Sequence, residues 1–405
     1  MGRPTSKVTK VVVKGPLAPF ADAYRSRLED FGYTALTTVN ELRQIAHLSR
    51  WMEAAAVAAA ELTTDRLEQF LKSRRARVGD RNCSFQGLGL LLGVLRASGV
   101  LVEEAPSAPT SANDVLLASF RRHLRTERGL AECTTDAYAV RAQRFLASCS
   151  VEGDLSTVTP ADVTKAVRDE AGRVSAGSAQ YFVAGLRSFL RFCFLEGLVD
   201  AELSGAALAV TGRRHSSLPK GISHAAAIAL LRSCDRRRSD GRRDYAILIV
   251  LLRLGLRAGE VARLTLDDVN WRAGEITVLG KGRRQDRLPL PAEVGEAIVG
   301  YLRRGRPRNT RREVFLRSLA PIGPLGRGGV SCVVRRACRR AGLPEVGAHR
   351  LRHTLACEMV AAGVGLPEIG QVLRQCSTSS TAIYARVDLA ALRQLALPWP
   401  GVEPR

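Results

Sequence analysis

Apolar residues recur at helical spacing through the first quarter of the chain. Between residues 16 and 104, leucine and isoleucine repeat every three or four positions, for example at Leu42, Ile45 and Leu48. This spacing lines the apolar side chains along one face of a helix, where they can be buried together. The pattern predicts a helical domain at residues 1–105.

A second helical domain is predicted at residues 113–205, after a connector rich in Pro, Ser and Ala at 106–112. Both domains contain a Thr-Thr pair before a helical pattern. Each ends in an apolar helix closed by a glycine, Gly99 or Gly197, which suits a left-handed helix C-cap. We interpret the first domain as a rough copy of the second, and chance similarity between two Leu- and Ala-rich bundles is the alternative.

The pattern changes to an alternation of polar and apolar residues at Glu275–Val278. Gly280–Gly282 supplies turn residues, and Arg287–Leu290 leads away from the turn. This order predicts a β-hairpin with Lys281 at its tip. Helical patterns surround it, so we expect the domain at 223–387, and the whole chain, to be mainly α with a small antiparallel sheet.

The net charge of the chain favours a polyanionic partner. Its 405 residues include 61 Lys and Arg against 39 Asp and Glu, a formal net charge of +22. Such a surface attracts polyanions, and nucleic acid is the usual partner. The alternative is a basic protein that merely stays soluble. A basic linker at 206–222 separates the second and third domains, and its Arg213, Arg214 and Lys220 are predicted DNA contacts.

The cysteine pattern and the hydropathy of the chain argue against a disulfide-stabilised, zinc-binding or membrane-spanning protein. The nine cysteines are scattered between Cys83 and Cys376 without a CxxC pair, and no histidine lies at metal-ligand spacing. This pattern indicates free thiols in a reducing compartment and predicts no metal site. The most apolar run ends at Arg253 and is too short to span a bilayer. We therefore expect a cytoplasmic protein that does not contact a membrane.

Two clusters carry side chains suited to phosphate chemistry. Arg257 is predicted to open a helix after Gly255, and Glu260 lies one turn further on, where a carboxylate can hold the arginine fork in place. His349 and Arg352 share one helical face, which suits proton handling beside a neutralised phosphate. Exposed Arg–Glu pairs and ordinary basic helices are the alternatives for each cluster alone. Tyr384 follows a Ser/Thr-rich run, and a lone tyrosine on a short helix is usually a packing residue.

In this order, the motifs resemble the active-site series of the tyrosine recombinases, the phage integrase family. The segment His349–Ala356 is similar to the family's His-x-Leu-Arg-His-Thr box, and Leu218–Ser223 resembles the opening of its catalytic domain. The resemblance is strong from Leu218 to Val387 and weaker back to Asn113. It implies a catalytic domain preceded by helical domains that clamp DNA. The matching residues are Arg257 with Glu260, Lys281, His349, Arg352 and Tyr384.

The chain departs from the family at one catalytic position. Nine residues before the tyrosine the family usually places a histidine, sometimes a tryptophan, after Leu-Gly. Here the sequence is Leu373-Arg374-Gln375. Glutamine keeps a hydrogen-bond donor but cannot carry charge. This departure leaves open a catalytically silent DNA-binding regulator.

The resemblance implies strand transfer without a metal ion or nucleotide cofactor. Tyr384 would attack the phosphodiester and form a 3′-phosphotyrosyl bond, which keeps the bond energy for rejoining. Arg257 and Arg352 would then stabilise charge on the phosphate, Lys281 would act as general acid, His349 would assist proton transfer, Gln375 would donate a hydrogen bond and Glu260 would orient Arg257.

Further elements are predicted to serve DNA binding and assembly. The helix predicted at 329–342 has an apolar stripe and carries Arg335, Arg336, Arg339 and Arg340, which we expect to contact phosphates, with a solvated basic face as the alternative. In the family a tail such as 388–405 docks on a neighbouring subunit; packing on its own domain is the alternative. The resemblance implies a tetramer on two double-stranded DNA sites, with accessory recombinases or proteins left open.

The predicted function is site-specific recombination, by the integrase or transposase of a mobile element. Relaxation of supercoils by a type IB topoisomerase is an alternative with the same chemistry. Covalent trapping of DNA separates both enzymes from the silent regulator.

Overall fold

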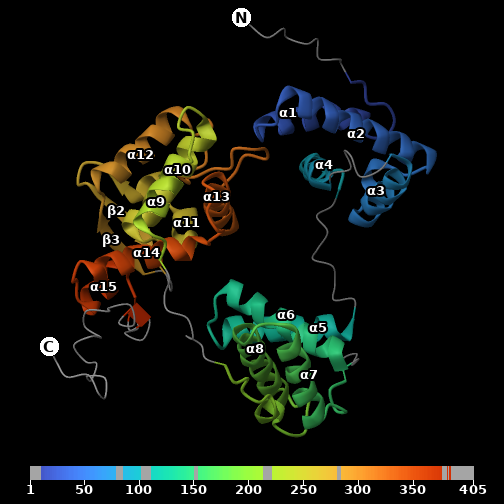
Figure 1. The fold of residues 1–405 in the computed structure, drawn as a ribbon. Coiled ribbons are helices and arrows are strands. Elements are labelled where there is room, and N and C mark those ends of the chain that lie inside the picture. The colour runs from blue at the N-terminus through green and yellow to red at the C-terminus, as the bar shows by residue number, and fades with distance from the viewer. Residues whose placement is uncertain are drawn as a thin grey trace, which may run out of the picture. The chain divides into compact units, whose positions relative to one another are not determined.

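The protein is mainly helical, with one three-stranded antiparallel sheet, as the sequence predicts (Figure 1). The chain divides into two compact units, residues 103–216 and residues 1–102 with 217–405. Within the described residues, no helix is both long and apolar enough to cross a membrane. The computed structural model describes residues 11–78, 85–101, 111–149, 154–212, 221–280, 284–375, 381, 383 and 384.

The first helical segment forms its own hydrophobic core. The predicted apolar positions Leu42, Ile45 and Leu48 are fully buried in that core. Gly99 has a φ of +70°, so the predicted left-handed cap is confirmed. The helices are α1 (Ala21–Asp30), α2 (Ala35–Ala54), α3 (Thr64–Val78) and α4 (Phe85–Ala97), with short 3-10 turns at Ala18–Phe20 and Ala59–Glu61.

The second helical segment also has four α-helices around a separate core. The Thr159 hydroxyl and the Asp162 carboxylate cap each other's backbone N–H groups at the start of its third helix. Phe120 and Phe189 pack edge to face in the core, with ring centroids 5.2 Å apart. That the two segments are copies remains a prediction. The helices are α5 (Ala112–Thr126), α6 (Glu132–Cys149), α7 (Pro160–Arg173) and α8 (Ala176–Leu195), followed by a 3-10 turn at Leu203–Ala206.

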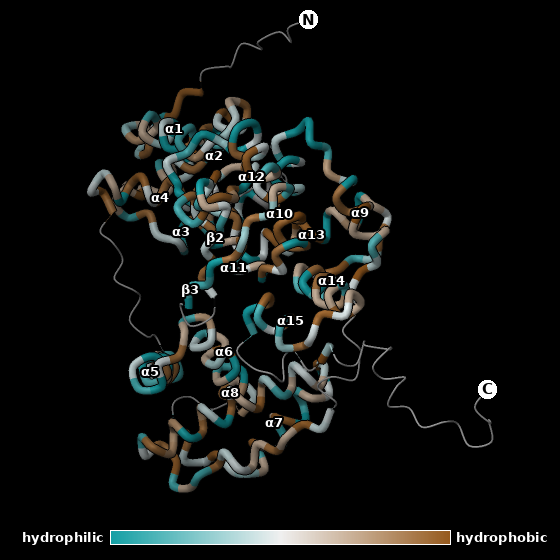
Figure 2. The backbone as a smooth tube through the Cα atoms, turned by 90° about the vertical axis from the view of Figure 1, so that its left-hand side faces the viewer, coloured by the Kyte–Doolittle hydropathy of each residue, from teal (hydrophilic) through white to brown (hydrophobic). Residues whose placement is uncertain are grey.

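The C-terminal segment is built around α10 (Ser239–Leu254), in which every residue from Ala246 to Leu252 is buried. A helix that is apolar on all sides lies inside a core, which explains this hydrophobic run (Figure 2). α10 ends at Gly255, whose φ is +57°. The surrounding helices are α9 (His224–Arg232), α11 (Ala258–Arg263), α12 (Ala292–Arg304), α13 (Arg327–Arg340), α14 (Ala348–Ala361) and α15 (Leu366–Val372), with a 3-10 turn at Leu266–Asp268.

The predicted hairpin is confirmed, and a third short strand joins it. The order is β1 (Val269–Asn270), β2 (Glu275–Leu279) and β3 (Gln285–Pro289), with antiparallel pairing that sets Ile276 opposite Leu288. Several predicted residues and one predicted segment lie outside the described part of the chain, namely Lys281 at the hairpin tip, Arg213, Arg214 and Lys220 of the linker, and the tail 388–405.

Candidate active site

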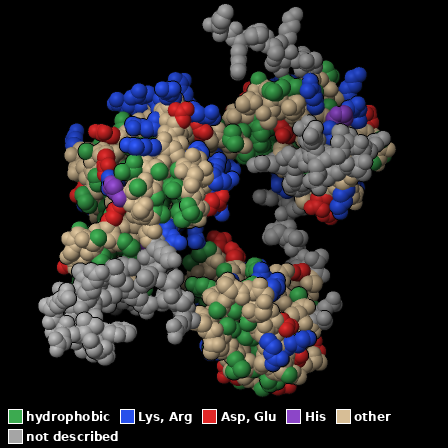
Figure 3. Space-filling model, in the orientation of Figure 1, with side chains coloured by type: hydrophobic (Ala, Val, Ile, Leu, Met, Phe, Trp, Pro, Cys, Tyr) green, Lys and Arg blue, Asp and Glu red, His purple; other side chains and the backbone are tan. Residues whose placement is uncertain are grey.

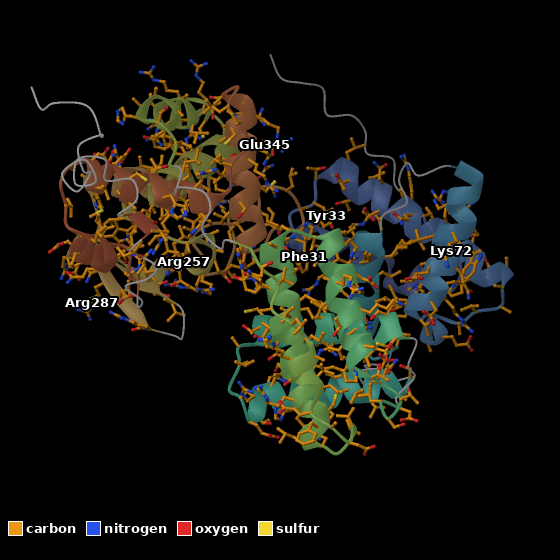
Figure 4. The ribbon with its side chains drawn as sticks, turned by 60° about the horizontal axis from the view of Figure 1, so that its bottom comes forward. Phe31, Tyr33, Lys72, Arg257, Arg287 and Glu345 are labelled. Carbon is orange, nitrogen blue, oxygen red and sulfur yellow. The ribbon has the colours of Figure 1, made fainter. Side chains whose placement is uncertain are left out.

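Arg257 and Glu260 form a closed ion pair at the start of α11. The Oε1 atom of Glu260 accepts a hydrogen bond from Nη1 of Arg257 at 2.7 Å, and its Oε2 atom accepts from the backbone N–H of Arg257 at 2.8 Å. The Glu260 side chain is 2% exposed, whereas that of Arg257 is 40% exposed. The structure confirms the predicted pairing of Arg257 with Glu260. The pair fixes the guanidinium of Arg257 while leaving much of its surface open to an anion (Figure 4).

Arg352 projects from α14 into the same cluster and is almost fully buried. Its Nη1 atom donates to the carbonyl of Gly255 at 2.6 Å, and its Nη2 atom donates to the carbonyl of Leu373. Burial, and then the positive charges of Arg257 and Arg374, lower the pKa of Arg352 to about 10. The guanidinium therefore remains charged at neutral pH, and its two backbone contacts fix its plane.

Tyr384 lies against α14 with no exposed surface. Its hydroxyl is 2.8 Å from Nδ1 of His353. Burial raises the pKa of Tyr384, although the nearby charge of Arg352 opposes this shift. The tyrosine is therefore a phenol at neutral pH, and it needs a proton acceptor before it can act as a nucleophile.

His353 is suited to be that acceptor, although sequence reasoning gave the proton-handling role to His349. Burial, and then the neighbouring His349 and arginines, lower the pKa of His353 to about 4, so its imidazole is neutral at pH 7. The rings of His349 and His353 meet edge to face, with centroids 4.4 Å apart. The signal for His353 was its position four residues after His349, which places both on one face of the helix.

Arg374 and Gln375 follow α15 and border the same cluster. The Oε1 atom of Gln375 accepts a hydrogen bond from the hydroxyl of Thr381 at 2.6 Å. Arg374 forms an ion pair with Glu260, with Nη2 3.0 Å from Oε2. Sequence reasoning gave Arg374 no role. It thus missed the second arginine that holds Glu260.

A cavity of about 730 Å³ adjoins these residues. Strand β3 contributes Arg287 (Figure 4), α15 contributes Gly370, and Arg374 and Gln375 complete one side. Among the described residues, Arg257 and Arg374 pair with the buried carboxylate of Glu260, Arg352 is close enough to feel their charges, and no group of His, Cys, Asp or Glu is arranged to hold a metal ion. The cluster holds more positive than negative charge, and Arg352 lies near the Tyr384 hydroxyl, an arrangement that would suit the attack of a hydroxyl on a phosphodiester.

The apolar stripe predicted on α13 is buried, and its arginines lie at the surface. Arg335 and Arg336 are exposed, while Arg339 pairs with Glu345 at 3.0 Å. Arg340 pairs at 3.4 Å with a buried aspartate of α10, so part of its charge is used within the domain. Figure 3 shows how widely Lys and Arg are spread over the surface. The four DNA contacts remain a prediction.

Two family models match parts of the chain, and one known relative matches nearly its full length. The model of the phage integrase family matches residues 221–390, and the model of the phage integrase N-terminal SAM-like domain matches residues 117–197. The chain is 39% identical over 396 residues to the integrase/recombinase y4rA of Sinorhizobium fredii, covering 96% of each protein. It is 31% identical over 309 residues to the tyrosine recombinase XerD of Mycobacterium tuberculosis, covering 71% of this chain and 97% of XerD.

A solved structure shares the fold. The XerH site-specific recombinase, in a post-cleavage complex with palindromic difH DNA, is 16% identical to this chain, and the match covers 98% of each chain with a TM-score of 0.53.

Proposed function

The chain belongs to the phage integrase family, the tyrosine recombinases, and we propose that Tyr384 is the residue through which it cleaves and rejoins DNA. Enzymes of this family cut and rejoin DNA strands through a tyrosine. The observation that carries the assignment is the 2.8 Å contact between the Tyr384 hydroxyl and neutral His353, in a cluster that also holds Arg352.

The geometry supports the following cleavage step. The Tyr384 hydroxyl passes its proton to Nδ1 of His353 as its oxygen attacks phosphorus. The bond from phosphorus to the 5′ oxygen then breaks, which leaves a 3′-phosphotyrosyl bond and, once that oxygen is protonated, a 5′-hydroxyl. Arg257 and Arg352 neutralise the charge that grows on the non-bridging oxygens. Lys281 is the proposed donor of the proton to the leaving oxygen.

The remaining roles follow from the same chemistry. Gln375 donates a hydrogen bond from its amide nitrogen to the phosphate while its carbonyl accepts from Thr381. His349 supports the ring of His353 and assists the proton transfer. A second 5′-hydroxyl reverses the reaction and joins the exchanged strand, so no metal ion or nucleotide takes part.

The proposed substrate is double-stranded DNA, held as a pair of sites by a tetramer of this chain in the cytoplasm. The formal charge of +22 supports binding to a polyanion. The XerH structure shows a family fold bound to its own DNA site. The proposed biological role is integration or transposition of a mobile element, with room for accessory recombinases or proteins.

Covalent trapping tests the assignment. A DNA substrate cut from the ends of the encoding element, nicked near the crossover point, is incubated with protein in EDTA and run on a denaturing gel. We expect an adduct with wild type and with Tyr181→Phe, a change at an exposed tyrosine of α8, but none with Tyr384→Phe. An adduct that persists in Tyr384→Phe would contradict the proposal. Tight binding without any adduct would favour the silent regulator, and relaxation of a supercoiled plasmid without a partner site would favour a topoisomerase.

A further inference from the structure

Arg374 has a backbone conformation that side chains with a Cβ atom rarely adopt. Its φ is +53°, and among the described non-glycine residues only Ala56, with a φ of +52°, is also left-handed. Glycine is the residue that normally fills such a position. An arginine here is unfavourable for the local backbone.

The guanidinium of Arg374 is buried inside the active-site cluster. Its side chain is 5% exposed, and its Nη2 atom lies 3.0 Å from Oε2 of Glu260. The same carboxylate holds Arg257 through its Oε1 atom and through the Arg257 backbone. Glu260 is therefore fixed between two arginines, and a shift of Arg374 would move Arg257.

One polar atom of Arg374 is unsatisfied. Its Nε atom is buried and has no hydrogen-bond partner in the described structure. A buried donor without a partner is unfavourable in a domain optimised for stability alone. The residue also borders the cavity beside strand β3, together with Gln375. These observations place a buried cation at the edge of the cavity, directly before Gln375.

The residue at position 375 suggests a role for the positive charge of Arg374. Gln375 is neutral and stands where a histidine is usual in the family, directly after the position of a glycine. The pair Arg374-Gln375 therefore carries a positive charge at the residue before the position where the family usually has a histidine. The left-handed turn directs that charge inward, onto Glu260.

We propose that Arg374 is a positioning residue for DNA cleavage, which replaces the missing histidine charge at 375 and holds Glu260 so that Arg257 faces the phosphate. The inference rests on the proposed function. It requires no direct contact between Arg374 and DNA, because the effect passes through Glu260 and through the electric field of the cluster.

The test compares Arg374→Gly, Gln375→His and the double variant in the full-length protein. Single-turnover cleavage of the nicked substrate is measured for each. Glycine fits the left-handed backbone, so Arg374→Gly removes the charge without adding strain. We expect it to cleave roughly 10- to 100-fold more slowly, the usual range for residues that orient a contacting group. Adding Gln375→His to this variant should restore most of the rate.

The pH dependence of cleavage separates positioning from simple loss of structure. Without Arg374 the carboxylate of Glu260 loses one of its two cationic partners, so its pKa rises. The acid limb of the pH–rate profile should then move to higher pH in Arg374→Gly. A purely structural role predicts a lower rate with an unchanged profile.

Ala56→Gly is the matched control, because it relieves the other left-handed non-glycine residue without changing any charge. It should leave cleavage unchanged. Arg374→Lys keeps the positive charge and the backbone strain, so it should retain more cleavage activity than Arg374→Gly. This comparison still holds if Arg374→Gly has a lowered melting temperature. Wild-type rates in Arg374→Gly, or a double variant no faster than Arg374→Gly, would overturn the inference. Failure of the proposed function would appear differently, as the absence of any adduct with the wild type.

Discussion

Nδ1 of His353 lies 2.8 Å from the hydroxyl of Tyr384, across 31 residues of sequence. His353 comes from α14 and Tyr384 follows α15, and the tyrosine side chain is fully buried where the two meet. Because the imidazole is neutral at pH 7, it can accept the proton that the phenol must lose.

Replacing His353 tests this contact. His353→Phe keeps a ring of similar size but removes the proton acceptor. We expect cleavage to slow about 100-fold or more, the range for loss of a general base. Single-turnover cleavage with an excess of enzyme measures the effect. The variant Glu358→Gln, at an exposed position of α14, serves as the control. Normal cleavage by His353→Phe would exclude this histidine as the acceptor.

The stability of the C-terminal domain should depend on pH through the same residue. The pKa of His353 falls from 6.5 to about 4 on folding, so the unfolded chain binds a proton at higher pH than the folded chain does. The free energy of unfolding should therefore decrease as the pH falls from about 6.5 to 4. Urea unfolding at several pH values measures this slope. The slope should be smaller in His353→Phe, and an equal slope in both proteins would contradict the assignment.

Removing the carboxylate of Glu260 should destabilise the fold. Glu260→Ala leaves the buried guanidinium of Arg374 without its partner, and breaking a buried ion pair from one side costs about 3–5 kcal/mol. Chemical denaturation measures the loss. Asp267→Ala is the control, because it breaks the pair with Arg312 on the open surface and should change stability little. Similar stabilities for the two variants would contradict the buried-pair argument.

Gly255 should not tolerate a side chain. A Cβ atom there would lie 2.9 Å from the side chains of Leu355 and Leu373, in a backbone with a φ of +57°. The Gly255 carbonyl also accepts from Arg352, so a displaced backbone would disturb the site. We expect Gly255→Ala to cost more than the roughly 1–2 kcal/mol of left-handed strain alone, and to slow cleavage.

Gly342→Ala measures the free-energy cost of left-handed backbone strain without the steric contacts present at Gly255. Gly342 has a φ of +67° but nothing within 4 Å of an added Cβ atom. Thermal unfolding of both variants should show the larger loss for Gly255→Ala. Equal losses would mean that the contacts with Leu355 and Leu373 are unimportant.

Local sequence patterns predicted the features that depend on neighbouring residues. The cap at Gly99, the Arg257–Glu260 pair and the hairpin at Glu275–Val278 each follow from chemistry within a few residues, and the structure contains all three. The family resemblance added the order of the catalytic residues along the chain.

Contacts between distant segments were beyond the same reasoning. Arg374 meets Glu260 across 114 residues, and no local pattern relates the two positions. His349 and His353 share one helical face and differ only in their position along the helix axis. Tertiary packing therefore determines which of the two contacts Tyr384, and the local sequence does not reveal it. A left-handed arginine is also disfavoured by local propensity, so only the folded structure identifies it.

The complete burial of the Tyr384 side chain would limit DNA cleavage at incorrect sites. A protein that carries a strand-breaking group through a cell full of DNA must avoid random nicks. Under the proposed function, a hydroxyl with no exposed surface cannot reach a phosphate, so we expect the chain to bind DNA without cutting it. Cleavage would then require a local rearrangement that exposes the Tyr384 oxygen, so the correct site could be recognised before a strand is broken.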